Sequence, residues 1–363
     1  MDFQYASEHD EFRESLRRFL SDQSPLARVR EVAEGGSHDP RLWRRLCVDL
    51  EVPGLHIAAR YGGTGGSLVV STVAFEELGR ALTPAPLLST TLAVEAVMRM
   101  GDEEQRSRLL PDLLAGRRIG SLAAARPSAT NAPTVLGEGV GRRIVLTGEC
   151  SPVLHGCVAD LFVVPAGLNG EVIPCVVAAD DPGVSVVRLP SFDSTRPVAT
   201  VRFAQSPAEG LTAGTPDDFE RVLDVSRILL AAEMLGGAEA CLALAVGYAK
   251  SRHQFDRPIG SFQAVKHACA DMMIEIDATR AVVMYAAMCA DDPTELRIAG
   301  PLVKAQAADT FLQCAGAAFQ IHGGIAFTWE HDLHLYFRRA QTSAALFGGS
   351  AQNRSLVADR AGL

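Results

Sequence analysis

The stretch SRHQFDRPIGSFQAVKH, residues 251–267, interrupts the most apolar part of the chain. RILLAAEMLGGAEACLALAVGYAK precedes it and ACADMMIEIDATRAVVMYAAM follows it, and both flanks are typical of long helices in a bundle. Two arginines, two glutamines and a Pro-Ile-Gly turn therefore stand between two largely buried helices. This pattern predicts either an ordinary helix–helix turn or a loop that reaches a ligand or a partner.

Outward from this stretch, the hydrophobic period changes twice along the chain. Residues 1–118 show helical spacing, 119–210 form short β-branched segments separated by turn residues, and 211–363 are helical again. We therefore expect an α+β multidomain fold with an N-terminal α-helical domain, a middle β-barrel or sandwich and a C-terminal four- or five-helix bundle. Segregated helices and strands disfavour a Rossmann fold. Asp39 and Asp102 are expected helix N-caps.

Composition excludes several classes of function. With 48% hydrophobic and 21% charged residues the chain is globular, and its net charge of −9 disfavours nucleic acid as a partner. The apolar runs are short and carry charges, and the N-terminus lacks an apolar signal region, so we expect no membrane segment and a cytoplasmic location. Eight cysteines without a CxxC pair predict reduced and mostly buried thiols.

Three motifs occur in order along these domains. VPGLHIAARYGGTGGSL lies in the first, the opening stretch lies in the third, and QIHGGIAF follows at 320–327. Together they resemble the acyl-CoA dehydrogenase family, flavoproteins whose bundle carries R-x-x-F-G-x-x-x-x-x-x-Q and Q-x-x-G-G-x-G-F. Asp256 stands where the first of these patterns has Gly. The residues that match the cofactor motifs are Arg252, Gln254, Phe255, Gln263, Gln320, Gly323 and Gly324.

In the family these motifs bind the FAD of a neighbouring subunit, so the resemblance implies FAD binding across an interface between subunits. The chemistry of the residues is compatible with that role. Arg252 presents a planar set of donors that suits a pyrophosphate. Gly323 and Gly324 lack a Cβ, so their N–H groups can approach a ligand closely. The glutamines can both donate and accept hydrogen bonds.

The resemblance also implies a catalytic base, because the α-proton of a thioester must be removed while a hydride leaves the β-carbon. Most of the family has Glu after an R-D-A helix, and here that position is Phe347 or Gly348, depending on the alignment. A minority has Glu on the first long C-terminal helix, where this chain has Ser226. Neither position is acidic, so no catalytic residue is assigned in this chain.

Other positions depart from the family pattern as well. The R-D-A segment reads R-R-A at 338–340, and Pro152 and Leu154 replace a Trp and a Thr of the middle domain. The half of the site that would serve a neighbour is thus complete, and the half that would serve this chain is not. This asymmetry resembles the heteromeric α2β2 branch of the family that shortens steroid side chains, in which only one chain carries the base.

The resulting hypothesis is FAD-dependent α,β-desaturation of an acyl-CoA, on a steroid side chain by resemblance. A homologous base-carrying subunit and an electron-transfer acceptor would be its partners. A second hypothesis is a self-sufficient homo-oligomer with a displaced base at Asp224, Glu233 or Glu239, although such acids are more often exposed or ion-paired. A third is a non-catalytic scaffold that binds CoA or a protein.

Two further patterns have simpler explanations. His331 and His334 in EHDLH have metal-ligand spacing, but a third ligand is not nearby in the sequence, so we interpret them as surface histidines without a metal. YGGTGGS, residues 61–67, resembles a phosphate-binding loop but lacks the Lys-Ser/Thr that would follow one, so we expect an ordinary turn.

Overall fold

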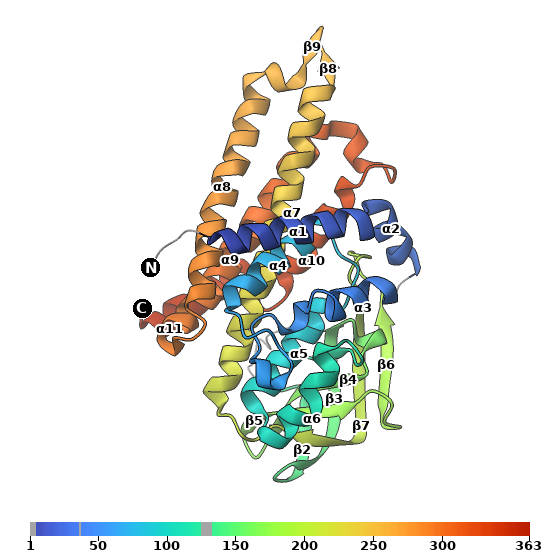
Figure 1. Ribbon diagram of the computed structural model, residues 1–363, viewed down its shortest axis with the longest axis vertical. Helices are drawn as coiled ribbons and strands as arrows, with labels where there is room; N and C mark the ends of the chain where they lie inside the picture. Colours follow the sequence, from blue (N-terminus) through green and yellow to red (C-terminus); the bar gives the residue numbers. More distant parts are fainter. Residues whose placement is uncertain (1–4, 36–37, 125–132) are drawn as a thin grey trace. The chain divides into compact units, whose positions relative to one another are not determined.

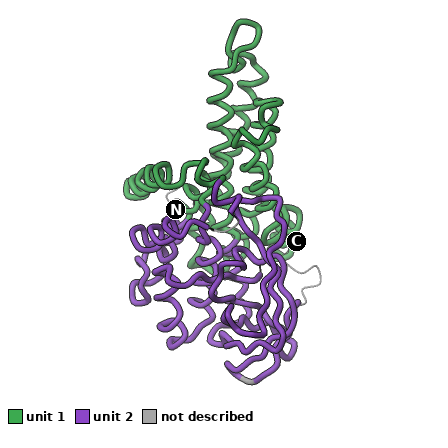
Figure 2. The backbone as a smooth tube through the Cα atoms, turned by 90° about the vertical axis from the view of Figure 1, so that its right-hand side faces the viewer, with its two compact units in different colours: residues 1–30, 72–83, 227–363 green, residues 31–71, 84–226 purple. Residues whose placement is uncertain are grey.

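The computed structural model describes residues 5–35, 38–124 and 133–363. The chain divides into two compact units (Figure 2). Unit 1 comprises the chain up to Arg30 together with Thr72–Thr83 and Arg227–Leu363, and unit 2 comprises Glu31–Ser71 and Pro84–Ser226. The N-terminal helical segment therefore contributes to both units. The domain borders at 118 and 210 remain a prediction, although both fall between secondary-structure elements.

Unit 2 contains most of the N-terminal helices and all strands of the middle segment. Its complete helices are α3 (Pro40–Val48), α5 (Leu87–Met100) and α6 (Glu103–Leu114). Asp39 caps α3 by accepting hydrogen bonds from the backbone N–H groups of Arg41 and Leu42, and Asp102 caps α6 by accepting from Gln105. Both predicted N-caps are thus confirmed. The segment that includes YGGTGGS forms turns and the short helices η1 (Val52–Gly54) and η2 (Ala59–Tyr61).

The strands of unit 2 form a single sheet. They are β1 (Gly120–Leu122), β2 (Val135–Val140), β3 (Arg143–Leu154), β4 (Leu161–Leu168), β5 (Glu171–Ala178), β6 (Val184–Leu189) and β7 (Val198–Gly210), with η3 (Gly156–Val158) after β3. Pairing runs β4–β2–β3–β7–β5 and returns to β4, so five strands close a barrel, while β1 joins β4 and β6 joins β7. Buried side chains such as Val135, Leu146 and Phe162 fill its core. The middle segment is therefore a barrel rather than a sandwich.

Unit 1 is a helical bundle. It contains α1 (Ser7–Gln23), the start of α2 (Leu26–Gly35), most of α4 (Leu68–Arg80) and most of α7 (Pro216–Ser251), followed by α8 (Gln263–Met288), α9 (Pro293–His322), α10 (Leu333–Ala345) and α11 (Ser350–Ala361). Helix α9 packs against α8, α10 and α11. Helix α7 has the length and composition of a membrane span, but 78% of its most apolar window is buried within the protein, which is typical of a core helix.

Glycines let α4 and α7 touch backbone to backbone. A Cβ on Gly79 would lie 1.9 Å from the carbonyl oxygen of Glu233, and one on Gly236 would lie 1.7 Å from that of Glu76. Neither distance is possible for a real side chain, so the close crossing requires glycine at both positions. This crossing brings the acidic pair Glu76 and Glu77 of α4 beside Glu239 of α7, which shares arginine partners with both.

Candidate functional site

The opening stretch folds into a hairpin beyond the end of α7 (Figure 1). Strand β8 (His253–Gln254) pairs with β9 (Arg257–Pro258) through a two-residue turn, in which Phe255 and Asp256 have φ angles of 53° and 60°. Positive φ at both positions matches a type I′ turn. Aspartate tolerates this conformation better than most residues do, so it can stand where the family pattern has Gly.

Arg252 is held by its backbone at the base of this hairpin. Its N–H donates to the carbonyl oxygen of Tyr248 over 2.8 Å, and its own carbonyl accepts from the N–H of Ile259 over 2.8 Å. The guanidinium is exposed and makes no hydrogen bond or ion pair within the described ranges. Its five donors are therefore free for an anionic ligand. The short helix η4 (Ile259–Ser261) then leads into α8, which begins at Gln263.

The second motif forms the end of α9. Gln320 lies in its last turn, and the helix ends where Gly323 adopts a φ of 65°. The short helix η5 (Gly323–Phe327) follows. No described atom lies within 4 Å of the Cβ positions of Gly323 or Gly324, apart from their chain neighbours, so the backbone here faces open space. The N–H of Gly323 donates to the carbonyl oxygen of Phe319, and a ligand can approach the outer side of this turn without steric hindrance.

Stacked rings hold the two motifs at the same end of the bundle. The ring of Tyr248, one turn before Arg252, stacks on His322 at a centroid distance of 4.5 Å. His322 is buried, and its Nδ1 lies 2.7 Å from the carbonyl oxygen of Ala318. Burial lowers the pKa of His322, which favours the neutral ring. The residues of both motifs are exposed at this end: Arg252, Gln254, Phe255, Gln263, Gln320, Gly323 and Gly324.

The loop at the expected base position is largely buried, in contrast to the exposed residues of the two motifs. Phe347 is 2% exposed, and Phe347 and Gly348 have φ angles of 53° and 93°. The side-chain amide of Asn353 donates to the carbonyl oxygens of Phe347, Gly348 and Gly349 at 3.2, 2.8 and 3.1 Å. A Cβ on Gly348 would lie 2.9 Å from that amide nitrogen. The loop 346–349 is thus closed around its own backbone and offers no carboxylate.

Lys304 supports the same loop from α9. Its side chain is fully buried, and Nζ donates to the carbonyl oxygens of Ala344 and Gly348 at 3.1 and 3.2 Å. Burial, with a smaller contribution from Arg227, lowers the pKa of Lys304 to about 7. Sequence reasoning missed this residue. The signal for it was a single lysine in the apolar run PLVKAQAA.

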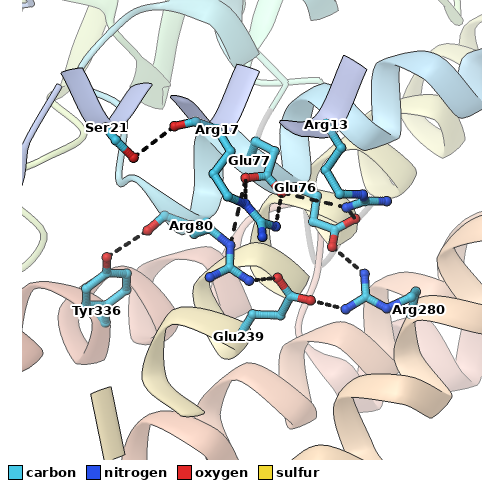
Figure 3. Close-up of polar contacts among 9 residues, drawn as sticks. All are labelled: Arg13, Arg17, Ser21, Glu76, Glu77, Arg80, Glu239, Arg280 and Tyr336. Atoms are coloured by element: carbon cyan, nitrogen blue, oxygen red, sulfur yellow. Dashed lines mark hydrogen bonds and ion pairs between the residues drawn. The ribbon is translucent and has the colours of Figure 1, made fainter. Parts of the chain in front are cut away.

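The other candidate base positions are buried or engaged in ion pairs. Ser226 is buried and donates to the carbonyl oxygen of Val222 at 2.7 Å. Glu233 pairs with Arg339 at 2.6 Å in a buried ion pair, which also explains how an arginine is tolerated in the R-R-A segment. Glu239 is paired with Arg80 and Arg280, as Figure 3 shows, and these contacts lower its pKa despite its burial. Asp224 is 1% exposed.

The interpretation of the EHDLH histidines needs a correction. His334 is 9% exposed rather than on the surface, because α10 packs it against the ring of Trp329 at 5.0 Å. His331 contacts His322 edge to face at 4.7 Å. Within residues 5–35, 38–124 and 133–363, no group of three or more His, Cys, Asp or Glu could hold a metal ion.

Comparison with known proteins gives the same family as the motifs. Residues 6–117 match the acyl-CoA dehydrogenase N-terminal domain, and residues 216–362 match the C-terminal domain. Acyl-CoA dehydrogenase IpdE2 of Mycobacterium tuberculosis is 38% identical over 346 residues, which cover 93% of this chain and 92% of the relative. The chain belongs to the acyl-CoA dehydrogenase family. It is therefore an oxidoreductase of a family that uses FAD to dehydrogenate acyl-CoA.

Two solved structures share the fold of this dehydrogenase over almost its whole length. The ChsE4-ChsE5 complex from Mycobacterium tuberculosis superposes with a TM-score of 0.90 at 28% identity, over 100% of this chain and 99% of that chain. A variant of the Tcur3481-Tcur3483 steroid ACAD also gives a TM-score of 0.90, at 29% identity and 98% coverage of both chains. The expected order of helical, β-rich and helical domains is confirmed as the fold of this family.

Proposed function

We propose that this dehydrogenase chain completes the FAD site of a homologous partner subunit, which supplies the catalytic base. The contrast between two regions carries the proposal. Exposed donors without partners in the described chain cover one end of the bundle, and they match the family's cofactor motifs. The positions where the family places its base hold Phe347, Gly348 and Ser226, all without a carboxylate.

The residues present at the bundle end are suited to FAD. The exposed guanidinium of Arg252 can bind a pyrophosphate through paired charge-assisted hydrogen bonds. The exposed backbone of the Gly323–Gly324 turn lets polar oxygens approach closely, and Gln254 and Gln320 can both donate and accept hydrogen bonds. When bound, FAD supplies the hydride acceptor for oxidation at the β-carbon. This chain's residues bind and orient, and a carboxylate of the partner takes the α-proton.

We further propose that the substrate is a steroid side-chain acyl-CoA. Two findings about other proteins support this. One neighbour at 29% identity is named as a steroid ACAD, and another at 28% identity is a complex of two chains. The proposal includes an electron-transfer acceptor and a cytoplasmic location, as the sequence predicts. The buried ion pairs of Glu233 and Glu239 disfavour a displaced base at either position.

Co-expression tests the partner requirement. The chain should be purified alone and together with a homologous chain that has the family Glu, and its flavin absorbance, native mass and acyl-CoA turnover measured. We expect bound flavin and turnover only in the mixed assembly, and its native mass should correspond to two chains of each kind. Substitution of the partner's Glu by Gln should abolish turnover while flavin stays bound. Turnover by the chain alone would contradict the proposal.

A further inference from the structure

A cavity of about 280 Å³ lies within unit 1, away from the hairpin and the loop 346–349. It is lined by residues from the end of α1, the start of α2, the end of α4 and from α10. Its lining combines polar and apolar side chains. Figure 3 shows several of the polar residues, among them Arg17, Arg80 and Tyr336. All the residues that line the cavity belong to unit 1.

Two buried donors of this cavity have no hydrogen-bond acceptor in the described chain. Ser24 is 3% exposed and its hydroxyl is unpaired. Nε of Arg80 is also buried without a hydrogen bond, since the nearest carboxylate oxygen, on Glu77, is 3.8 Å away. Both residues line the cavity. Unpaired buried donors are uncommon in folded proteins, and a bound acceptor is one of the few explanations for them.

The charges around the cavity favour an anion as that acceptor. Four arginines and three glutamates form one network of ion pairs, so positive charge is in excess (Figure 3): Arg13, Arg17, Arg80 and Arg280 with Glu76, Glu77 and Glu239. Glu77 lines the cavity, but its two oxygens accept from Arg17 at 2.7 and 2.8 Å. Helix α2 begins at Leu26, which also lines the cavity, and the partial positive charge of its N-terminus adds to the positive charge there.

The apolar part of the lining selects the body of the ligand. It consists of Leu20, Pro25, Leu26 and Ala81. A free inorganic anion would leave this surface in contact with water, whereas a short hydrocarbon chain would cover it. We propose that this cavity is a binding site for a small monocarboxylate with a short apolar chain. Its carboxylate accepts hydrogen bonds from Ser24 Oγ and Arg80 Nε, and its chain lies against the apolar lining residues.

Titration of hexanoate into the purified full-length chain, in the assembly in which it is isolated, tests this site. Isothermal titration calorimetry should give saturable binding at one site per chain. Ser24→Ala should weaken binding about tenfold, because one hydrogen bond to a charged group is lost. Ala81→Leu should abolish binding by filling the cavity. Ser15→Ala changes an exposed serine of α1, the helix that ends just before Ser24, and should bind hexanoate like the wild type.

Three outcomes would overturn the site. One is the absence of saturable hexanoate binding, which would leave water as the occupant. Another is unchanged affinity in both Ser24→Ala and Ala81→Leu. A third is equal affinity for hexan-1-ol, which would show an apolar cavity without anion recognition. The flavin content of each variant is measured in parallel with a base-carrying partner present, and it should not change. Failure of the carboxylate site is thereby distinguished from failure of the proposed FAD role.

Discussion

Polar groups are exposed at the hairpin end of the bundle, whereas those of the loop 346–349 are hydrogen-bonded within the chain. At the bundle end, Arg252 and the Gly323–Gly324 turn are exposed, and the guanidinium of Arg252 has donors that nothing in the described chain accepts. In the loop, Lys304 and Asn353 donate to consecutive carbonyl groups, and Phe347 is buried. A folded chain satisfies most of the polar groups that it buries. Exposed donors at a well-ordered turn, by contrast, are available to an external ligand.

This difference separates stability from binding within one helical bundle. The loop contributes its hydrogen bonds to folding, so changes there should lower the free energy of unfolding. The bundle end contributes little to folding, so changes there should lower the affinity for FAD and leave stability intact. A substitution in the loop that lowered FAD affinity instead of stability, or one at the bundle end that lowered stability instead of FAD affinity, would contradict this separation.

The largest expected effect is on the loop. Asn353→Ala removes three hydrogen bonds from buried carbonyl groups, and we expect the free energy of unfolding to fall by about 2–4 kcal/mol. Urea denaturation of the purified assembly measures it. Ser355→Ala, an exposed position on the same helix, should change stability by less than about 0.5 kcal/mol. An unchanged midpoint in Asn353→Ala would mean that water replaces the amide and that the loop is not closed.

The second prediction concerns the bundle end. Arg252→Ala should weaken FAD binding by about 30- to 100-fold in the mixed assembly, because charge-assisted hydrogen bonds to a pyrophosphate are lost. Measured without FAD, its unfolding midpoint should remain that of the wild type, since the guanidinium has no partner within the described residues. Flavin retention on a desalting column and fluorescence titration measure the affinity. Arg297→Ala, also an exposed arginine of the bundle, is the matched control. A destabilised Arg252→Ala with normal flavin affinity would reverse the assignment.

Sequence patterns could predict features that are local. The N-caps at Asp39 and Asp102 and the Gly323–Gly324 turn each depend on a few consecutive residues, whereas the turn at Phe255–Asp256 was not predicted. The order of helical and β segments likewise follows from hydrophobic period, which changes twice along the chain. The closed barrel agreed with one of two alternatives, because short strands alone do not decide between a sandwich and a ring.

The loop and the ion pairs could not be predicted because they join distant parts of the chain. Lys304 reaches a carbonyl 44 positions later, and Arg339 pairs with a glutamate 106 positions earlier. A sequence shows that Phe347 is not an acid, but it does not show what occupies that space. The buried position of His334 was missed for a similar reason, since charged neighbours in EHDLH gave the segment a surface character.

The smallest predicted effect is the pH dependence of the free energy of unfolding that Lys304 causes beside the loop 346–349. The pKa of Lys304 is lowered to about 7 in the folded chain from 10.5, so between these values the unfolded chain binds a proton that the folded chain does not. The free energy of unfolding should therefore rise with pH in this window, by about 2 kcal/mol between pH 7.5 and 9, and this slope should vanish below pH 7. Lys304→Met should remove that increment relative to the wild type, whatever its own stability, while Lys266→Met, an exposed lysine of α8, should retain it. Urea midpoints at several pH values give the slopes. Parallel slopes for wild type and Lys304→Met would mean that Lys304 stays protonated in the folded protein, and that the loop carbonyls stabilise a buried charge rather than a neutral amine.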